Sequence, residues 1–187
     1  MDAYPPCSNR LRIQQNAGMA ELEIRDVGYR HPDAVRLIAE VQAEYVVRYG
    51  GPDDAVIDGS QFDPPAGLFA VGYCDGSPVA MGGWRTLDPD DPTTSWANPV
   101  AELKRMYVTA AMRGAGFARA MLAYLERSAA EHGLRWLVLE TGSKQPEALA
   151  LYQSAGYHEV PAFGHYADQP LARHLGKQLG PSSSASD

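Results

Sequence analysis

The sequence predicts one α/β (α+β) domain built on a mixed β-sheet with helices packed against it. Three observations support this prediction. The 187 residues suit a single ordinary domain, and 45% hydrophobic with 21% charged residues is typical of a chain that buries a core. Segments with strand and helix patterns follow one another along the chain. An Asp-Gly turn between two apolar runs indicates an antiparallel strand pair.

The domain itself is expected to span residues 20–180. Residues 1–19 have no hydrophobic period and predict a flexible N-terminal extension, whereas the serine-rich residues 181–187 predict a disordered tail. Within the domain, residues 21–27 are typical of a strand and residues 32–48 of an amphipathic helix. That helix is expected to bury a stripe of four side chains: Val35, Ile38, Val41 and Tyr45.

The middle of the chain predicts a long loop and a hairpin. Residues 53–65 are acidic and lack periodicity, so we expect a loop that is a candidate lid over a pocket. Residues 68–74 and 77–87 are apolar runs, and Asp75 and Gly76 between them can adopt the positive φ angles of a tight turn.

The C-terminal half of the domain predicts alternating strands and helices. The expected elements are a strand at 101–108, a helix from about 117 to Gly133, a strand at 135–140, a helix from Pro146 to Gly156, and strands within 157–166 and 171–180. The strand at 101–108 carries Glu102, Lys104 and Arg105, and we expect it to be too polar for the buried middle of a parallel sheet.

The distribution of charge excludes one class of partner and suggests another. A formal net charge of −7 argues against general nucleic-acid binding, which depends on phosphate contacts. Residues 1–99 hold fifteen acidic and seven basic side chains, whereas residues 100–119 carry a net charge of +3. The basic stretch is a candidate anion site, although a solvated basic edge would have the same composition.

The cysteines and the apolar runs indicate a cytoplasmic protein. Cys7 and Cys74 are too few for a disulfide framework, and no CxxC or HExxH pattern predicts a metal site. Cys74 ends an apolar strand and is expected to be a small buried side chain. No apolar stretch approaches the roughly 20 residues of a membrane helix, and no signal-peptide core precedes residue 20. We therefore expect neither membrane nor metal binding.

The strongest functional signal is the glycine loop at residues 113–118, between a strand and a helix. Gly114 and Gly116 let backbone N–H groups approach an anion next to the positive end of the helix dipole. Three interpretations fit: a structural turn, a dinucleotide fingerprint, and a cradle for the diphosphate of coenzyme A. The fingerprint would use Glu140 as its acid, but Arg119 stands where its third glycine should be.

Two motifs together decide between these interpretations. Val108 followed by Arg113-Gly114-x-Gly116-x-Ala118 resembles the [Q/R]xxGx[G/A] pattern of the GNAT superfamily of acyltransferases, and Gln145 to Tyr157 resembles its second motif. The resemblance covers about residues 21–180. It implies an N-acetyltransferase that uses acetyl-CoA as cosubstrate. It also implies a mostly antiparallel sheet that splays open in the middle, where pantetheine lies.

The resemblance also implies a set of residues that bind the cosubstrate: Met106, Tyr107, Val108, Arg113, Gly114, Ala115, Gly116, Phe117, Ala118, Gln145, Ala148 and Tyr152. In this set the backbone of the strand pairs with pantetheine, and the amides of the loop surround the diphosphate. The chain departs from the family at two positions. Ala110 replaces the usual proline, and Gln145 replaces the asparagine that bonds pantetheine.

Acetyl transfer to an amine needs a base, an oxyanion donor and an acid. An alkylamine with a pKa near 10.4 is only about one part in a thousand neutral at pH 7, so a base must accept its proton. Glu102 and Glu140 stand where family members keep such a base, and we favour Glu102; either could instead be an ion-pair partner. The N–H of Val108 would polarise the thioester carbonyl. Tyr152 would protonate the leaving thiolate, unless it is a core aromatic residue.

For the acceptor, the sequence favours a small-molecule amine such as an amino acid, a polyamine or an amino-antibiotic. Arg85, Glu102, His165 and Tyr166 are the candidate acceptor-side residues. A protein or peptide amine is the first alternative, and a non-catalytic acyl-CoA-binding module is the second. No nucleic-acid partner is expected, and a homodimer is compatible with the sequence.

Overall fold

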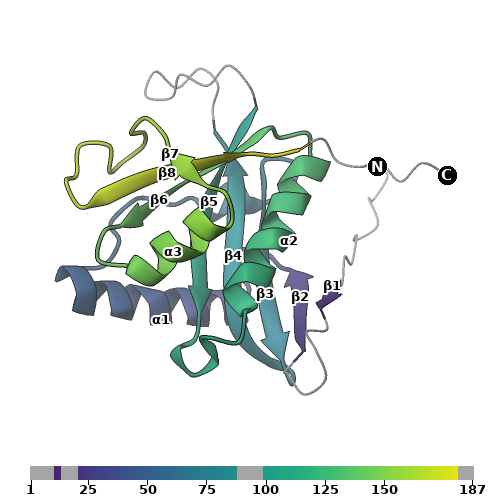
Figure 1. The fold of residues 1–187 in the computed structure, drawn as a ribbon. Coiled ribbons are helices and arrows are strands. Elements are labelled where there is room, and N and C mark those ends of the chain that lie inside the picture. The colour runs from purple at the N-terminus through teal and green to yellow at the C-terminus, as the bar shows by residue number, and fades with distance from the viewer. Residues whose placement is uncertain (1–10, 14–20, 88–98, 181–187) are drawn as a thin grey trace.

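The computed structural model describes residues 11–13, 21–87 and 99–180 and contains one sheet flanked by helices (Figure 1). The eight strands lie in the order β1-β2-β3-β4-β5-β6-β8-β7. The strands are β1 (Leu11–Ile13), β2 (Leu22–Asp26), β3 (Gly67–Cys74), β4 (Ser77–Thr86), β5 (Val100–Val108), β6 (Trp136–Gly142), β7 (His158–Glu159) and β8 (Ala172–Gln178). The helices are α1 (Pro32–Tyr49), α2 (Phe117–Glu131) and α3 (Pro146–Ser154), with 3₁₀ turns η1 (Gly59–Phe62) and η2 (Ala110–Met112).

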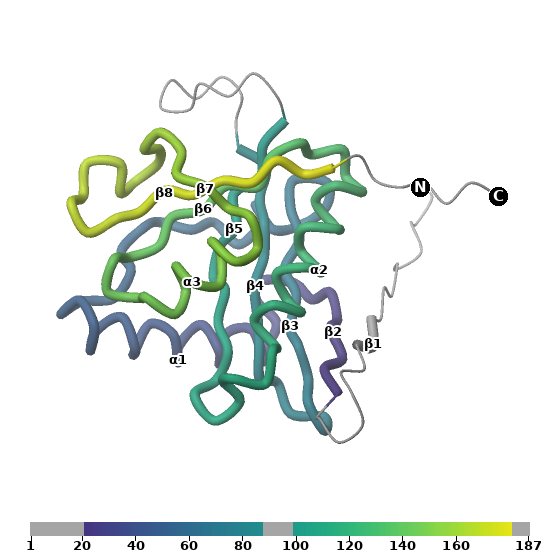
Figure 2. Tube along the Cα trace, viewed as in Figure 1, coloured from purple at the N-terminus to yellow at the C-terminus, as the bar shows by residue number. Residues whose placement is uncertain are grey.

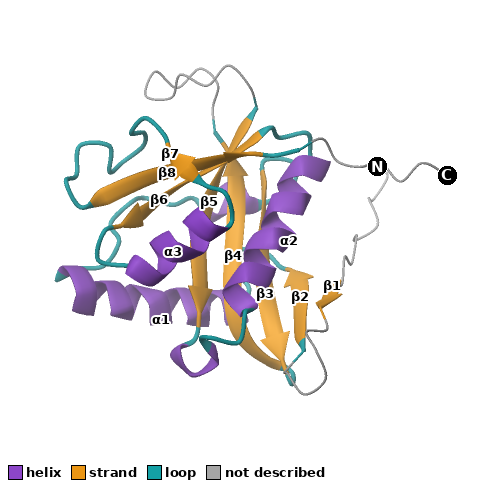
Figure 3. Ribbon diagram, in the orientation of Figure 1, coloured by secondary structure: helices purple, strands orange, loops and turns teal. Residues whose placement is uncertain are grey.

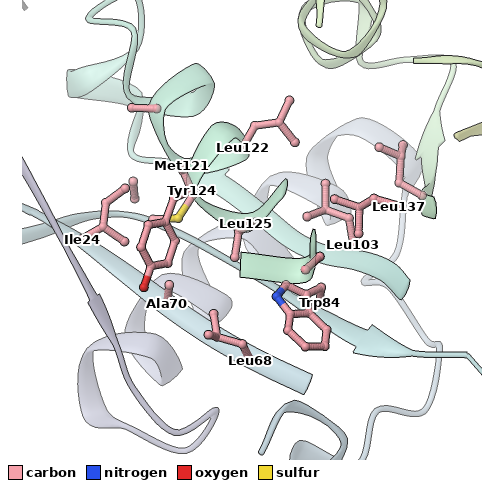
Figure 4. Packing of buried hydrophobic residues seen from close by; sticks show 14 of the residues in the cluster. Ile24, Leu68, Ala70, Trp84, Leu103, Met121, Leu122, Tyr124, Leu125 and Leu137 are labelled. Carbon is pink, nitrogen blue, oxygen red and sulfur yellow. The ribbon is translucent and has the colours of Figure 1, made fainter. Parts of the chain in front are cut away.

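The helices cover both faces of the sheet, as Figures 1 and 3 show. α2 and α3 pack on one face over a large apolar cluster, part of which is drawn in Figure 4. In that cluster Met121 and Leu125 of α2 are fully buried, as is Trp84 of β4. α1 covers the opposite face with a second cluster that includes Phe69 and Met81. The mixed α/β architecture with a mostly antiparallel sheet is therefore as predicted.

The buried face of α1 differs from the predicted one. Ala34, Leu37 and Val41 are its buried residues, whereas Val35 is 51% exposed. The prediction was wrong at Val35 and missed Leu37, because the buried stripe runs through Ala34, Leu37 and Val41 and places Val35 on the solvent side. His31 caps the helix by accepting a hydrogen bond from the N–H of Asp33 at 3.2 Å.

The predicted hairpin is confirmed. β3 and β4 pair antiparallel from Gly67 with Arg85 to Cys74 with Ser77. Asp75 and Gly76 both have positive φ, 49° and 74°, as the tight turn requires. Cys74 is buried with a free thiol, and burial raises its pKa above the ordinary value.

The sheet opens between β5 and β6. The two strands pair in parallel only from Val100 with Trp136 to Leu103 with Leu139, and β6 and β8 then turn away from β5 (Figure 2). β5 continues alone beside β4 to Val108. This confirms the splayed sheet, and because β5 pairs antiparallel with β4 and parallel with β6, it does not lie in the middle of a parallel sheet. Its buried Glu102 is tolerated because two cations neutralise it.

A β-bulge marks the point of divergence. The register between β4 and β5 shifts between Met81 and Gly83, so two residues of β5 lie opposite one of β4. Arg105 at this bulge has φ of 58°, a left-handed conformation that is uncommon for a residue other than glycine. Strain of this kind persists where surrounding contacts hold it, often at functional sites.

Three further segments differ from the sequence expectation or lie outside the structure. Within the expected N-terminal extension, Leu11–Ile13 form β1 and pair with β2. Of the strand expected within 157–166, only His158–Glu159 pair with β8, since the following residues leave the sheet as a loop. The expected C-terminal tail lies outside the described residues.

The described residues contain neither a membrane-spanning helix nor a group of side chains suited to hold a metal ion. No helix among them combines the length and apolarity needed to cross a bilayer. In the same part of the chain, no group of three or more histidine, cysteine or acidic side chains has a geometry that could hold a metal ion.

Candidate active site

A cavity of about 360 Å³ lies where β5 and β6 diverge. One wall consists of β5 residues from Leu103 to Met106, and the opposite wall of β6 residues from Glu140 to Gly142. α3 contributes Ala148 and Tyr152. The end of α1, the residues after it and the loop before β8 complete the lining.

The side of the cavity next to α3 is largely uncharged. Leu103, Met106, Ala148 and Tyr152 line it together with Gln145, which is the N-cap residue of α3. The Nε2 of Gln145 donates a hydrogen bond to the hydroxyl of Tyr49 at 3.2 Å. In place of the family's asparagine, Gln145 thus ties α3 to the end of α1 within the cavity wall.

Tyr152 is buried and lines the cavity from α3. Its ring centroid lies 5.5 Å from that of Tyr157, tilted by 60°. Burial raises the pKa of the Tyr152 phenol above its ordinary value. The hydroxyl therefore keeps its proton at neutral pH and can act as a hydrogen-bond donor.

The backbone of β5 presents an open edge beyond the point of divergence. The N–H of Thr109 donates to the carbonyl of Val79 on the β4 side at 2.9 Å. Successive N–H groups of a strand point to opposite edges, so the N–H of Val108 points to the side that β6 has left. The Val108 carbonyl on that side accepts a hydrogen bond from Nε of Arg113 at 3.2 Å. Val108 does not line the cavity, whereas Met106 does.

The glycine loop has the conformation that an anion cradle needs. Gly114 and Gly116 have φ of 81° and 82°, and a Cβ added to Gly114 would meet no atom within 4 Å. Gly116 is the N-cap of α2, which has neither a side-chain cap nor an acidic residue in its first turn. The first N–H groups of α2 are thus available to an anion. The loop lies outside the cavity lining, beyond the open edge of β5.

The basic side chains of residues 100–119, a candidate anion site by sequence, pair with other groups of the protein. Lys104 pairs with Glu140 and Arg105 with Asp53 at the cavity. The guanidinium of Arg113 pairs with Glu44 of α1, and NH2 of Arg119 donates to Ser154 Oγ at 2.7 Å. An anion at the glycine loop would therefore be held mainly by backbone N–H groups.

A row of charged side chains crosses one face of the sheet over β4, β5, β6 and β8. Arg85 Nε donates to Glu102 Oε2 at 2.9 Å, and Lys104 Nζ lies 2.6 Å from Glu102 Oε1. Both oxygens of Glu102 are thus held by cations, and its side chain is only 3% exposed. Neither Glu102 nor Arg85 lines the cavity.

Glu140, in contrast, lines the cavity. Its Oε2 accepts from Lys104 Nζ at 3.1 Å. Its Oε1 lies 3.3 Å from His174 Nε2 and 3.4 Å from the backbone N of Tyr166. Of the two candidate bases, Glu140 thus lines the cavity, whereas Glu102 lies outside its lining and pairs with Lys104.

The charged end of the cavity centres on Asp53, just after α1. Its Oδ2 accepts from Arg105 NH1 at 2.6 Å, and its Oδ1 accepts from the hydroxyl of Tyr166 at 2.6 Å. Its backbone is held by Gln42 of α1, whose Oε1 accepts from the N–H of Asp53 at 2.8 Å. Asp54 lies 2.7 Å from the same tyrosine hydroxyl. Three chain segments that are distant in sequence therefore meet at one carboxylate.

Several site residues were missed by sequence reasoning. Asp53, Asp54, Tyr45, Tyr49 and Arg105 all line the cavity. The acidic segment 53–65, predicted as a lid, contains the first two and was the available signal. Gly142 lines the same cavity, and a Cβ there would clash with Tyr49.

The remaining predicted residues lie outside the cavity lining. Tyr107 packs its side chain towards α1, so only its backbone could meet a ligand on β5. Phe117 is buried under α2. His165 is exposed and its Nε2 lies 3.2 Å from Asp54, whereas its neighbour Tyr166 lines the cavity.

Comparison with known proteins gives a consistent picture. The model of the Acetyltransferase (GNAT) family matches residues 34–157. The IAA acetyltransferase of Azospirillum brasilense is 38% identical over 78 residues, which cover 42% of this chain and 51% of that protein. The chain thus aligns with only about half the length of this relative.

Two other similar proteins are covered over most of their length. The uncharacterized N-acetyltransferase YjgM of Escherichia coli (strain K12) is 28% identical over 151 residues, which cover 78% of this chain and 84% of that one. A crystal structure from Klebsiella pneumoniae subsp. pneumoniae MGH 78578, provisionally named an acyl-CoA N-acyltransferase, superposes with a TM-score of 0.70 at 28% identity. It covers 85% of this chain and 98% of its own.

Proposed function

Because this chain belongs to the acetyltransferase (GNAT) family, we propose that it transfers the acetyl group of acetyl-CoA directly to a primary amine of a small molecule. The observation that carries this proposal is the cavity between β5 and β6, which Tyr152 and Glu140 line from opposite elements. A proton donor and a proton acceptor thus face one space. Its volume of about 360 Å³ lies in the range of small-ligand pockets.

The donor is expected to lie along the open edge of β5. The glycine loop and the uncapped start of α2 would hold the diphosphate through backbone N–H groups. Pantetheine would then run along β5 towards the cavity. We assign the N–H of Met106, in place of Val108, to the thioester carbonyl, because Met106 lines the cavity and Val108 does not. A comparable oxyanion donor is worth about 3 to 4 kcal/mol in other enzymes.

We assign the base to Glu140. The amine nitrogen attacks the thioester carbon, and the new N–C bond makes the nitrogen acidic enough to release a proton to this carboxylate, directly or through water. Glu102 is a poorer candidate than the sequence suggested, since Arg85 and Lys104 hold both of its oxygens outside the cavity. Its role is to neutralise these two cations within the sheet.

Tyr152 completes the reaction as the acid. When the tetrahedral intermediate collapses, the C–S bond breaks and the thiolate accepts the phenolic proton, giving the free thiol of coenzyme A. The raised pKa of Tyr152 keeps this proton in place until the sulfur becomes basic. The phenol is then reprotonated from solvent, and the proton taken by Glu140 returns there.

The alternatives differ in the acceptor or in the absence of chemistry. A protein or peptide amine would have to enter a cavity whose rim is bridged by the contact of Tyr166 with Asp53 and Asp54. A non-catalytic acyl-CoA-binding module would need the glycine loop but neither Glu140 nor Tyr152. We place the protein in the cytoplasm, where the buried thiol of Cys74 would stay reduced.

The test is thiol release from acetyl-CoA in the presence of a panel of primary amines. We expect amine-dependent release from the wild type, and a loss of about a hundredfold in kcat for Tyr152→Phe, as for loss of a general acid. Binding of acetyl-CoA should change little, because the ring remains. Amine-independent or absent release from the wild type would exclude transfer and favour the binding module. Full turnover of Tyr152→Phe would remove this residue from the mechanism.

A further inference from the structure

Two adjacent basic residues of β5, Lys104 and Arg105, line the same cavity. Their side chains are 12% and 5% exposed, so both charges are largely removed from water. Burying a charge is costly unless partners satisfy it. Any N–H donor of these cations that the acidic groups around the cavity leave unused is available to a ligand.

Arg105 retains unused capacity. A guanidinium has five N–H donors; the carboxylate of Asp53 takes one of them through NH1 at 2.6 Å, and the guanidinium also interacts with the Tyr29 side chain. The Nε of Arg105 is buried without a hydrogen-bond partner among the described residues. The φ of 58° at Arg105 holds this side chain at the bulge, at the cost of backbone strain. A buried arginine with one carboxylate partner and an idle donor is suited to receive a second anion.

Lys104 is in a similar state. Its ammonium has three donors, and two of them serve Glu102 at 2.6 Å and Glu140 at 3.1 Å. One donor remains, on a side chain that lines the cavity next to Arg105. Lys104 and Arg105 together offer charged N–H donors to a ligand in this part of the cavity.

The acids of the cavity are, by contrast, already engaged. Asp53 accepts from Arg105, from the Tyr166 hydroxyl and from the N–H of Ala55. Both oxygens of Glu140 have protein partners. Asp54 is 75% exposed at the rim. Among the charged groups lining the cavity, the unused hydrogen-bonding capacity is therefore on the cations, although the acids outnumber them.

From this imbalance we infer that the acceptor carries a carboxylate close to its amine, as in a small amino acid, and that Arg105 with Lys104 binds this carboxylate. The inference rests on the proposed acetyl transfer and narrows its substrate class. The amine would face Glu140 while its carboxylate lies on Arg105. A polyamine would instead bring a second cation beside two buried ones, which is unfavourable.

The first test needs only the wild-type protein and matched acceptors. Each amino acid is compared with its amide and with the amine left by decarboxylation, for example alanine with alaninamide and ethylamine, or lysine with cadaverine. We expect kcat/KM to be at least about tenfold higher for the carboxylate member of each set, as for a charge-assisted hydrogen bond. Equal values within the sets would overturn the inference.

The second test assigns the preference to Arg105. Arg105→Gln should raise KM for amino acids about tenfold or more while changing KM for the decarboxylated amines little. Arg105→Lys keeps a cation and should retain part of the preference. Arg25→Gln removes an equal charge from a partly exposed pair with Glu23, outside the cavity lining, and should leave the preference unchanged. Acetyl-CoA binding and the thermal unfolding midpoint are measured for each variant as controls of folding.

The outcomes separate this inference from the proposed function. Thiol release with no amine in the panel would defeat acetyl transfer itself. Release with amines regardless of a carboxylate would leave transfer intact and defeat only the inference. If Arg105→Gln keeps the full preference for acceptors with a carboxylate, another group binds that carboxylate. Arg105→Lys replaces Arg105→Gln in this comparison if Arg105→Gln does not fold.

Discussion

We expect the two ends of the proposed site to bind their ligands by different means. The donor end, assigned to acetyl-CoA, is the glycine loop with the start of α2, and the acceptor end, assigned to the amine, is the cavity around Asp53 and Arg105. At the donor end, Gly114 and Gly116 shape a loop of backbone N–H groups, and the nearby arginines are tied to Glu44 and Ser154. At the acceptor end, side chains from β5, β6, the segment after α1 and the loop before β8 meet in hydrogen bonds and ion pairs. The donor end is a local conformation, and the acceptor end is a product of the whole fold.

This difference explains how the two ends can vary independently. A backbone cradle depends on few residue types, mainly glycines at positive φ, and can stay constant while its surroundings change. An acceptor end made of side chains changes its ligand when a single charge changes. We therefore expect substitutions at the two ends to separate cleanly into effects on the cosubstrate and effects on acceptor chemistry.

The largest expected effect is the loss of the base. Glu140→Gln should lower kcat by about 10²- to 10⁴-fold, the usual contribution of general base catalysis, because an amide cannot accept the amine proton. KM for acetyl-CoA should stay close to that of the wild type, since Glu140 lies on β6, away from the glycine loop. Steady-state kinetics with both substrates varied would measure the two effects separately.

Glu102→Gln is the matched control for this variant. Glu102 holds Arg85 and Lys104 but does not line the cavity, so its loss should act on stability. We expect a decrease of about 2 kcal/mol in the free energy of unfolding, as for one charged hydrogen-bonded pair, measured by denaturant titration. The reverse pattern, with kcat lost in Glu102→Gln and kept in Glu140→Gln, would restore the base assignment that the sequence favoured.

The two ends also differ in how well the sequence predicts them. The glycine loop could be predicted because its conformation depends on its own residues and on the helix that follows. The sequence favoured Glu102 as the base, whereas Glu140 lines the cavity, because position on a strand does not say which side chains a splayed sheet exposes. Arg105 was considered only as one charge of the basic stretch and as an ion-pair partner, since its orientation follows from a bulge with no signature in the sequence.

The fold itself was largely predictable, and two errors in its prediction have a common cause. The hairpin at Asp75 and Gly76 and the helix ended by Gly133 were found from local turn chemistry. Val35 was misplaced, and the strand expected within 157–166 is mostly loop. At both places the outcome depends on contacts with distant segments, such as the packing of Phe163 on His174 at 5.2 Å.

A smaller effect is expected at the donor end from Gly114→Ala. The φ of 81° disfavours any side chain, and the added Cβ would stand in the open space that we assign to the diphosphate. We expect about a tenfold increase in the Kd for acetyl-CoA, measured by calorimetry, with acceptor preference unchanged.

Gly133→Ala controls for backbone strain in this experiment. Gly133 has the same φ of 81° and equally open surroundings, but it follows α2 at the end remote from the loop. Both variants should lose about 1 kcal/mol of stability. Equal weakening of acetyl-CoA binding in the two variants would mean that strain, and not occupation of the cradle, is responsible.

The smallest expected effect concerns the bridge over the acceptor end. The Tyr166 hydroxyl lies 2.7 Å from Asp54 Oδ1, and this hydrogen bond is the first cause of the lowered pKa of Asp54, followed by that of His165. In Tyr166→Phe the pKa of Asp54 should rise towards its ordinary value, and KM for the acceptor should rise by a few-fold because Asp53 also loses this hydroxyl. NMR titration of the Asp54 carboxyl carbon measures the first effect.

The sign of the accompanying stability change follows from the direction of this shift. Because folding lowers the pKa of Asp54, the contact stabilises the protein above the ordinary pKa near 4 and is lost as pH falls through the folded value. The stability difference between wild type and Tyr166→Phe should therefore narrow in acid. Tyr73→Phe removes a comparable hydroxyl, which lies 2.8 Å from Asp33 in the first turn of α1, and should leave Asp54 unchanged. An Asp54 pKa that does not move in Tyr166→Phe would mean that the acceptor end is not closed by this bridge in solution.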